Sequence, residues 1–143
     1  GLSRMELEEL SPAETKKREK SIARLGEDLM EAVSENDVER ASELVRGGAD
    51  PNYADDFGFS CLHVCAKRGR LAMLRMLVGE GGDLNLVGEG GTSPLHMAAQ
   101  YGQLETVKAM VDMGADVDAR DMEGGTPLRL AETFGQMEVA SYL

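Results

Sequence analysis

The sequence predicts an all-α solenoid of about four helix-turn-helix units joined by β-hairpin-like loops, preceded by an N-terminal helical extension. The main observation is a period of 33 residues, and a fixed period of this size is typical of stacked repeats. It appears in one leucine series and two glycine series: Leu62, Leu95 and Leu128; Gly69, Gly102 and Gly135; Gly48, Gly81 and Gly114. Each period also holds two short helix-like segments around a glycine turn. Such a pair cannot bury its apolar face alone, so neighbouring pairs must stack.

The composition agrees with a stacked array rather than a domain with one large core. The 143 residues include three Phe, three Tyr and no Trp, so Leu, Ala, Val and nine Met must supply the packing. The sequence contains neither an apolar run long enough to span a bilayer nor a signal-peptide pattern. We therefore expect a cytoplasmic protein, with the nucleus as an alternative location.

Charge is distributed unevenly along the chain. Residues 1–25 hold six basic and five acidic residues, a net charge of +1, whereas residues 26–143 hold nine and twenty-one, a net charge of −12. An acidic array disfavours nucleic acid and anionic membranes as partners, and it favours a protein with a basic or mixed surface. The alternative is that the charge serves solubility alone.

Residues 1–25 are predicted to form the N-terminal extension, mostly helical from about residue 12. The segment Ser11-Pro12-Ala13-Glu14 has the pattern of a helix start, with Ser as N-cap and Pro at the first helical position. The KKREK segment at residues 16–20 is open to a nuclear-import interpretation, but its acidic neighbours favour a solvated helix face. Residues 1–10 begin with Gly rather than Met, so we give the first residues no weight in the fold prediction.

Helical apolar spacing begins at Ile22, Leu25, Leu29 and Val33. Gly26 interrupts this pattern, and we expect a bend there between the extension and the repeat domain. The repeat domain should then span residues 26–143. Its repeats cover about 26–54, 55–87, 88–120 and 121–143. The fourth repeat stops part-way through its second helix, which favours a longer natural chain.

Three hexapeptides at one repeat position carry a family resemblance: SCLHVC from Ser60, SPLHMA from Ser93 and TPLRLA from Thr126. Together with the glycine turns and the GADPN, GGDLN and GADVD segments, they make residues 29–143 resemble an ankyrin repeat protein, whose signature is T-P-L-H-x-A. The departures from the family pattern are Cys61 for Pro, Arg129 for His, Gly88 for Asp and Glu132 for a small apolar residue. Gly88 leaves the shape of the middle hairpin open, while Arg129 and Glu132 suggest a polar cap.

Histidine and cysteine side chains invite a metal-binding or catalytic interpretation, but their positions favour packing. His63 and His96 share one repeat position, where the ring can bond to the neighbouring unit. Cys61 and Cys65 lie on one helix face, while His63 lies about 200° round from Cys61. No carboxylate is placed beside a nucleophile or a phosphate-binding loop. We expect no metal, no cofactor and no enzymatic activity.

Asn52 and Asn85 stand at the same place in successive turns. The family resemblance implies a context that an asparaginyl hydroxylase can read. A role as turn residues is the stronger prediction, because Asn side chains bond to nearby backbone. Whether either residue is modified stays open.

The resemblance implies a module for protein–protein interaction that binds through a concave face made of hairpin tips and first helices. Such a module would serve as an adaptor, an inhibitor or the recognition domain of a larger protein, and we expect a monomer. We call the positions carried over from the family the contact strip. It consists of Asp56, Phe57, Phe59, Lys67, Arg68, Glu89, Thr92, Gln100, Tyr101, Met122, Glu123, Thr133 and Phe134. The alternative is a structural or assembly factor that docks through its N-terminal helix, residues 12–25.

All three phenylalanines fall on the contact strip. We predict a cluster of anchoring residues formed by Phe57, Phe59, Arg68 and Tyr101, since aromatic and arginine side chains often dominate binding energy. Acidic residues at the hairpin tips, Asp55 among them, should form its rim. Phe57 and Phe59 are expected to have little of their own unit to pack against. For Tyr101 and Phe134 the alternative is that the ring braces the adjacent turn.

Overall fold

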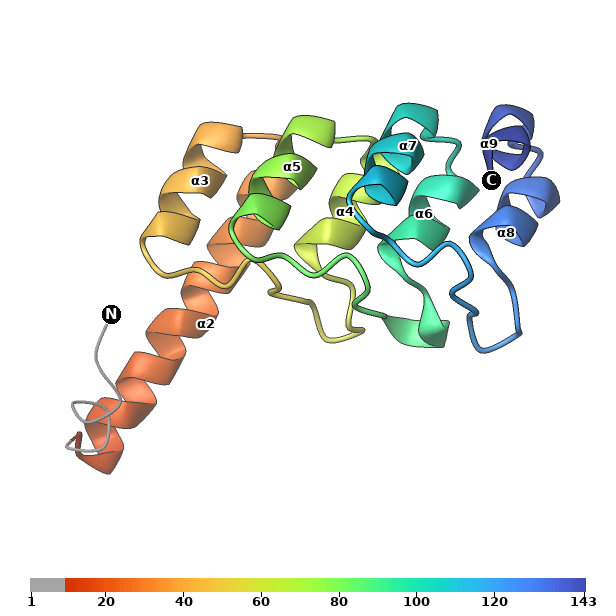
Figure 1. The fold of residues 1–143 in the computed structure, drawn as a ribbon. Coiled ribbons are helices and arrows are strands. Elements are labelled where there is room, and N and C mark those ends of the chain that lie inside the picture. Colours follow the sequence, from red (N-terminus) through yellow and green to blue (C-terminus); the bar gives the residue numbers. More distant parts are fainter. Residues whose placement is uncertain (1–9) are drawn as a thin grey trace.

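The computed structural model describes residues 10–143 and shows antiparallel helix pairs stacked side by side (Figure 1). Eight α-helices and one short 3-10 helix lie in this part of the chain. They are α2 (Pro12–Ser34), α3 (Val38–Arg46), α4 (Cys61–Arg68), α5 (Leu71–Gly79), η1 (Glu89–Gly91), α6 (Pro94–Gln100), α7 (Leu104–Asp112), α8 (Pro127–Thr133) and α9 (Met137–Tyr142). The predicted all-α solenoid is confirmed. Within residues 10–143, no helix combines the length and apolar character that crossing a bilayer requires.

The helices form two layers with the core between them. One layer holds α2, α4, α6 and α8, and the other holds α3, α5, α7 and α9, with each helix contacting its neighbours in the same layer (Figure 1). Both layers contribute fully buried side chains, such as Leu62 from α4 and Leu77 from α5. Burying one such side chain stabilises the fold by about 1.5–3 kcal/mol. The array is therefore stabilised at every interface between neighbouring units.

The short first helices begin where the repeated hydroxyl residues predict. Ser60, Ser93 and Thr126 are the N-caps of α4, α6 and α8, and each side chain accepts the backbone N–H three residues later. Ser11 caps α2 in the same way, as predicted, and the Glu14 carboxylate accepts the backbone N–H of Ser11 in return. Because these bonds satisfy N–H groups that have no partner inside the helix, each cap stabilises its helix by about 1 kcal/mol.

The predicted bend at Gly26 is wrong, because α2 continues from Pro12 to Ser34 as one helix. Gly26 is buried, and a Cβ atom added there would overlap the Tyr53 ring. The glycine therefore allows α2 to pack closely against the turn that follows α3. It does not change the direction of the helix. The predicted boundary between residues 25 and 26 falls inside α2, and the division into two domains stays a prediction. Residues 1–9 of the predicted extension lie outside the described part of the chain.

The middle hairpin differs in shape from its neighbours, and Gly88 is the reason. In the second unit, Asp55 Oδ1 accepts the backbone N–H groups of Phe57 and Phe59 at 2.9 and 3.0 Å. Asp121 does the same in the fourth unit. Gly88 occupies the equivalent place without a side chain, and the 3-10 helix η1 forms there, with Gly90 at φ 77°. This conformation is one that glycine adopts readily.

Candidate functional site

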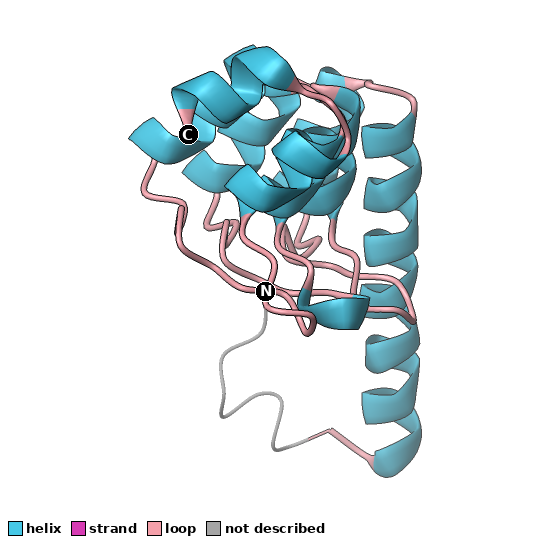
Figure 2. Ribbon diagram, turned by 90° about the vertical axis from the view of Figure 1, so that its right-hand side faces the viewer, coloured by secondary structure: helices cyan, strands magenta, loops and turns pink. Residues whose placement is uncertain are grey.

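Backbone hydrogen bonds join the hairpin tips of successive units. The Glu89 N–H donates to the Phe57 carbonyl at 2.8 Å, and the Met122 N–H donates to the Gly90 carbonyl at 2.9 Å. Figure 2 shows the loops extending together beyond the helix pairs. The tips of the second, third and fourth units therefore form a continuous surface, along which most of the contact strip lies.

The two histidines link neighbouring units, as predicted. Ser60 N–H donates to His63 Nδ1 at 3.0 Å, and His63 Nε2 lies 2.8 Å from the Thr92 carbonyl. His96 repeats this arrangement between Ser93 N–H and the Gly125 carbonyl. Because the carbonyl can only accept and the N–H can only donate, the ring is neutral with its proton on Nε2. Burial lowers the pKa of His63, which favours the same neutral form.

The cysteines are buried within the array. Cys61 and Cys65 are both fully buried and not bonded to each other. Burial raises the pKa of the Cys61 thiol to about 12 and also raises that of Cys65. Both thiols therefore remain protonated at neutral pH and have little nucleophilic character. In residues 10–143, no group of three or more His, Cys, Asp or Glu side chains is suited to hold a metal ion.

Asn52 and Asn85 link neighbouring turns, which extends their predicted role as turn residues. Asn52 Oδ1 accepts the Asp83 N–H at 2.7 Å, and Asn52 Nδ2 donates to the Gly81 carbonyl at 3.2 Å. Asn85 Oδ1 accepts the Asp116 N–H at 3.1 Å. These bonds fix the spacing of successive units on one side of the array. The turns that join α4 to α5 and α6 to α7 lie on the opposite side.

Two glutamines that the sequence analysis missed fix the spacing at those turns. Gln103 Nε2 donates to the Lys67 carbonyl at 3.0 Å, and Gln136 Nε2 donates to the Gln100 carbonyl at 2.9 Å. The available signal was their common repeat position, 33 residues apart. They hold the ends of α4 and α6, where several contact-strip residues lie.

Four large apolar side chains of the contact strip are exposed. Their exposed fractions are 63% for Phe57, 44% for Tyr101, 83% for Met122 and 53% for Phe134. The charged members of the strip are exposed as well, namely Asp56, Lys67, Arg68, Glu89 and Glu123. Thr133 is exposed, whereas Thr92 and Gln100 are partly buried. The structure thus places apolar and charged groups on the same surface.

Phe59 differs from Phe57, and the expectation that it has little of its own unit to pack against is wrong. Its ring meets the His63 ring edge to face, with centroids 5.4 Å apart. It also packs against Gly88, where an added Cβ would lie 2.7 Å from a Phe59 ring carbon. Phe59 is therefore partly buried between two units. Its role as a contact residue stays a prediction, but Phe57 is the freely exposed ring of this tip.

Tyr101 and Lys67 form a pair between the second and third units. Lys67 Nζ lies 5.1 Å from the centre of the Tyr101 ring. A cation above an aromatic face is attracted by the ring's electron density. The alternative interpretation of Tyr101 as a bracing residue is thus supported, although the ring keeps 44% of its surface exposed.

A cavity of about 470 Å³ lies between α6 and α8 on the contact strip, and we call it the strip cavity. It is lined by Gln100, Asp121, Glu123, Gly125, Arg129, Leu130, Thr133 and Phe134. Four of these are contact-strip residues, whereas Asp121, Gly125, Arg129 and Leu130 were missed as lining residues. Arg129 is exposed, and so is Glu132, in agreement with the predicted polar face of the last unit.

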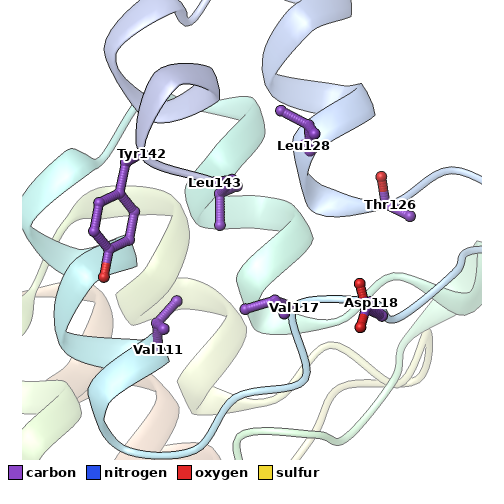
Figure 3. A pocket seen from close by; sticks show the side chains of 7 residues that line it. All are labelled: Val111, Val117, Asp118, Thr126, Leu128, Tyr142 and Leu143. Atoms are coloured by element: carbon purple, nitrogen blue, oxygen red, sulfur yellow. The ribbon is translucent and has the colours of Figure 1, made fainter.

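A second cavity, of about 480 Å³, lies beside α9, and none of its lining residues belongs to the contact strip (Figure 3). In Figure 3, Tyr142, Leu143 and Val111 surround one side and Thr126 and Asp118 the other. Val117, which lines it, is 39% exposed, whereas Leu84 at the equivalent position of the preceding unit is 6% exposed. The cavity is therefore an open, mainly apolar groove between the third and fourth units.

Comparison with known families agrees with this geometry. A family model described as ankyrin repeats (3 copies) matches residues 29–121 and, in a second match, residues 80–143. The two matches together extend from the buried half of α2 to the end of the chain. No curated protein matches the sequence.

Proposed function

Since the chain belongs to the ankyrin repeat family, we propose that it binds a partner protein through the contact strip. Ankyrin repeats are generally modules for protein–protein interaction, and they typically have no enzymatic role. The observation that carries the proposal is the series of exposed apolar side chains along the joined hairpin tips and first helices. The protein would act as an adaptor, an inhibitor or the recognition domain of a larger protein.

Large exposed apolar side chains of this kind are more typical of an interface than of the surface of a protein that acts alone. Phe57, Met122 and Phe134 each leave more than half of their surface in water. Covering such side chains is favourable by about 25 cal/mol for each Å² of apolar surface removed from water. Aromatic side chains also lose little conformational freedom on binding, so they are frequent anchors.

The charges around these rings favour a partner with basic or mixed character. Asp55, Asp56, Glu89 and Glu123 are exposed at the hairpin tips. Lys67 and Arg68 add positive charge at the end of α4. Carboxylates at the rim steer a basic partner and increase its association rate more than its final affinity. Binding should therefore weaken as salt concentration rises.

The proposal is tested by affinity capture with the full chain as bait, followed by quantitative mass spectrometry of the bound proteins. We expect Phe57→Ala combined with Phe134→Ala to lose the specific partner, because truncating one anchor typically weakens binding by about 2 kcal/mol or about thirtyfold. Met137→Ala is the matched control, since Met137 is an exposed apolar residue of α9 outside the strip. Equal capture by the double variant and the control would contradict the proposal.

The second candidate function, docking through the N-terminal helix, is favoured by one specific observation. The first half of α2 extends beyond the repeat units (Figures 1 and 2). Lys16, Lys17, Lys20 and Arg24 are exposed on it and lie within about 100° of one another around the helix, on the side opposite Leu29. This basic face is free to meet an acidic surface.

The same capture experiment separates the two candidates. A variant with Lys16→Glu, Lys17→Glu and Lys20→Glu removes the basic face without altering a buried residue. If this variant loses the partner while the Phe57 and Phe134 variant retains it, docking through α2 is the better description. The reverse outcome supports the contact strip.

A further inference from the structure

The repeat period allows the strip cavity to be compared with the corresponding place one unit earlier. Between the second and third units, Lys67 lies over the Tyr101 ring. Advancing by 33 residues leads from Lys67 to Gln100 and from Tyr101 to Phe134. Between the third and fourth units an aromatic ring is therefore kept, but the lysine is replaced by a shorter, uncharged side chain.

The replacement coincides with open space. Gln100 and Phe134 both line the strip cavity of about 470 Å³, and Phe134 keeps 53% of its surface exposed. The Gln100 carbonyl accepts a bond from Gln136, in the same way that the Lys67 carbonyl accepts one from Gln103. The same backbone hydrogen bond is therefore present in both places, and one difference beside the ring is the absent lysine side chain.

The wall of the strip cavity has carboxylates at two positions where the preceding unit has glycine. Asp121 and Glu123 line the cavity, whereas Gly88 and Gly90 stand at the equivalent positions one unit earlier. Arg129 also lines it and contributes one positive charge. Within residues 10–143, the ion pairs shorter than 4.0 Å do not include Asp121, Glu123 or Arg129. The two carboxylates outnumber the guanidinium, although Asp121 Oδ1 already accepts the backbone N–H groups of Glu123 and Gly125.

We infer that the strip cavity receives a lysine or arginine side chain of the partner protein, with its cation over the Phe134 ring and beside the carboxylates of Asp121 and Glu123. The inference rests on the proposed function of the contact strip, and it names the chemistry that the partner presents there. The pair of Lys67 and Tyr101 shows within this chain how a cation is held at the equivalent place. The aliphatic stem of the incoming side chain would lie along Leu130, which is partly buried in the cavity wall.

The test uses small probes and the full chain, because it then needs no identified partner. The probes are the Nα-acetyl methylamides of lysine and arginine, with the norleucine compound as an uncharged control of similar length. They are titrated into labelled protein while backbone amide resonances are followed by NMR. We expect saturable shifts at Gly125, Thr133 and Phe134 with the two cationic probes and none with the norleucine probe.

Substitutions in the cavity identify the contacts. Gln100→Lys restores the residue found at position 67 and fills the cavity from within the chain, so it should abolish the saturable shifts. Gln100→Met is the matched control without a cation and should retain them. Phe134→Leu should weaken binding of the cationic probes about two- to fivefold, as expected for loss of an exposed cation–aromatic contact. Glu123→Gln should weaken it in the same direction.

Three outcomes would overturn the inference. The first is an equal response to the norleucine probe, which would make the cavity an apolar site. The second is an absence of shifts with every probe, and the third is shifts that survive Gln100→Lys. None of these outcomes removes the proposed function, because loss of partner capture by Phe57→Ala alone, at a residue outside the cavity, tests the strip separately. If the proposed function and this inference are both correct, Gln100→Lys should also lower the amount of captured partner.

Discussion

The two ends of the array are closed in different ways. At the N-terminal end, α2 covers α4 and buries Leu29, Ala32 and Val33 completely. At the other end, α8 buries only Pro127 and Ala131, while Leu128 stays partly exposed. In a repeat array the total stability is the sum of unit and interface contributions. The same repeat position therefore carries different energetic weight at the two ends.

The largest effect should separate the two ends at one repeat position. Leu29, Leu62, Leu95 and Leu128 are successive members of the leucine series. Leu29→Ala removes a fully buried side chain and should cost about 2–5 kcal/mol of unfolding free energy. Leu128→Ala should cost much less, because part of that side chain already meets water. Urea unfolding of the two variants measures the difference, and equal midpoints would contradict a stability gradient along the array.

The second prediction concerns the contact that fixes α2 on the array. Gly26→Ala should destabilise the protein by about 1–3 kcal/mol, because the new methyl group overlaps the Tyr53 ring. In a Tyr53→Ser background the same substitution should stabilise α2 by up to about 1 kcal/mol, because alanine is a better helix former than glycine. A change of sign between the two backgrounds, measured by thermal or urea unfolding, is the expected result. If Gly26→Ala destabilises both equally, the ring contact is not the reason for the glycine.

Gly26 also shows which parts of the fold the sequence could predict. The repeat period and the caps follow from residues close together in the chain, so the helices and their order were predictable. An isolated glycine inside a helical pattern signals either a bend or a close approach. The choice between them depends on Tyr53, which belongs to another turn.

The contact strip was predictable to a similar extent. The positions exposed on hairpin tips recur with the period, and Phe57, Met122 and Phe134 are exposed where the family resemblance places them. Phe59 was not predictable from its own unit, because its ring occupies the space left by Gly88 in the next unit. The Phe59 ring and the missing side chain at Gly88 therefore fit each other. The strip cavity likewise became visible only when the Lys67 pair was compared with Gln100 one unit later.

The third prediction compares an interior unit with the last unit at one repeat position. This position holds His63 in the second unit and Arg129 in the fourth. His63 is buried and its pKa is lowered by desolvation, so the unfolded chain binds a proton more readily than the folded chain. Stability should therefore fall as pH decreases below about 6.5, the ordinary histidine pKa. Protonation of Nδ1 would also break the bond from the Ser60 N–H. Arg129 stands at the same position of the last unit, where it replaces the histidine.

The measurement is the urea midpoint at pH 7.5 and pH 5.0 for the natural protein and for His63→Gln. The variant should be less stable at pH 7.5 by about 1–3 kcal/mol, because a buried bonding partner is lost. It should also show a smaller decrease between the two pH values. Arg129→Gln serves as the control and should leave the pH dependence unchanged. An equal decrease in the natural protein and His63→Gln would assign the acid sensitivity to other groups.

The smallest predicted effect lies at the C-terminal end of the array. Val139 is the one buried residue of α9, and Tyr142 lies with its ring 5.8 Å from Lys108 Nζ of α7. Because about two-fifths of each side chain is exposed, Tyr142→Leu should cost only about 0.5–1 kcal/mol through loss of the cation–aromatic contact. Lys108→Met should cost a similar amount, and the double variant should cost less than the sum of the two, as residues in direct contact do. Strictly additive costs in urea unfolding would mean that burial of Val139, rather than the Lys108 contact, holds α9 on the array. In that case the two ends would differ only in how much apolar surface they bury.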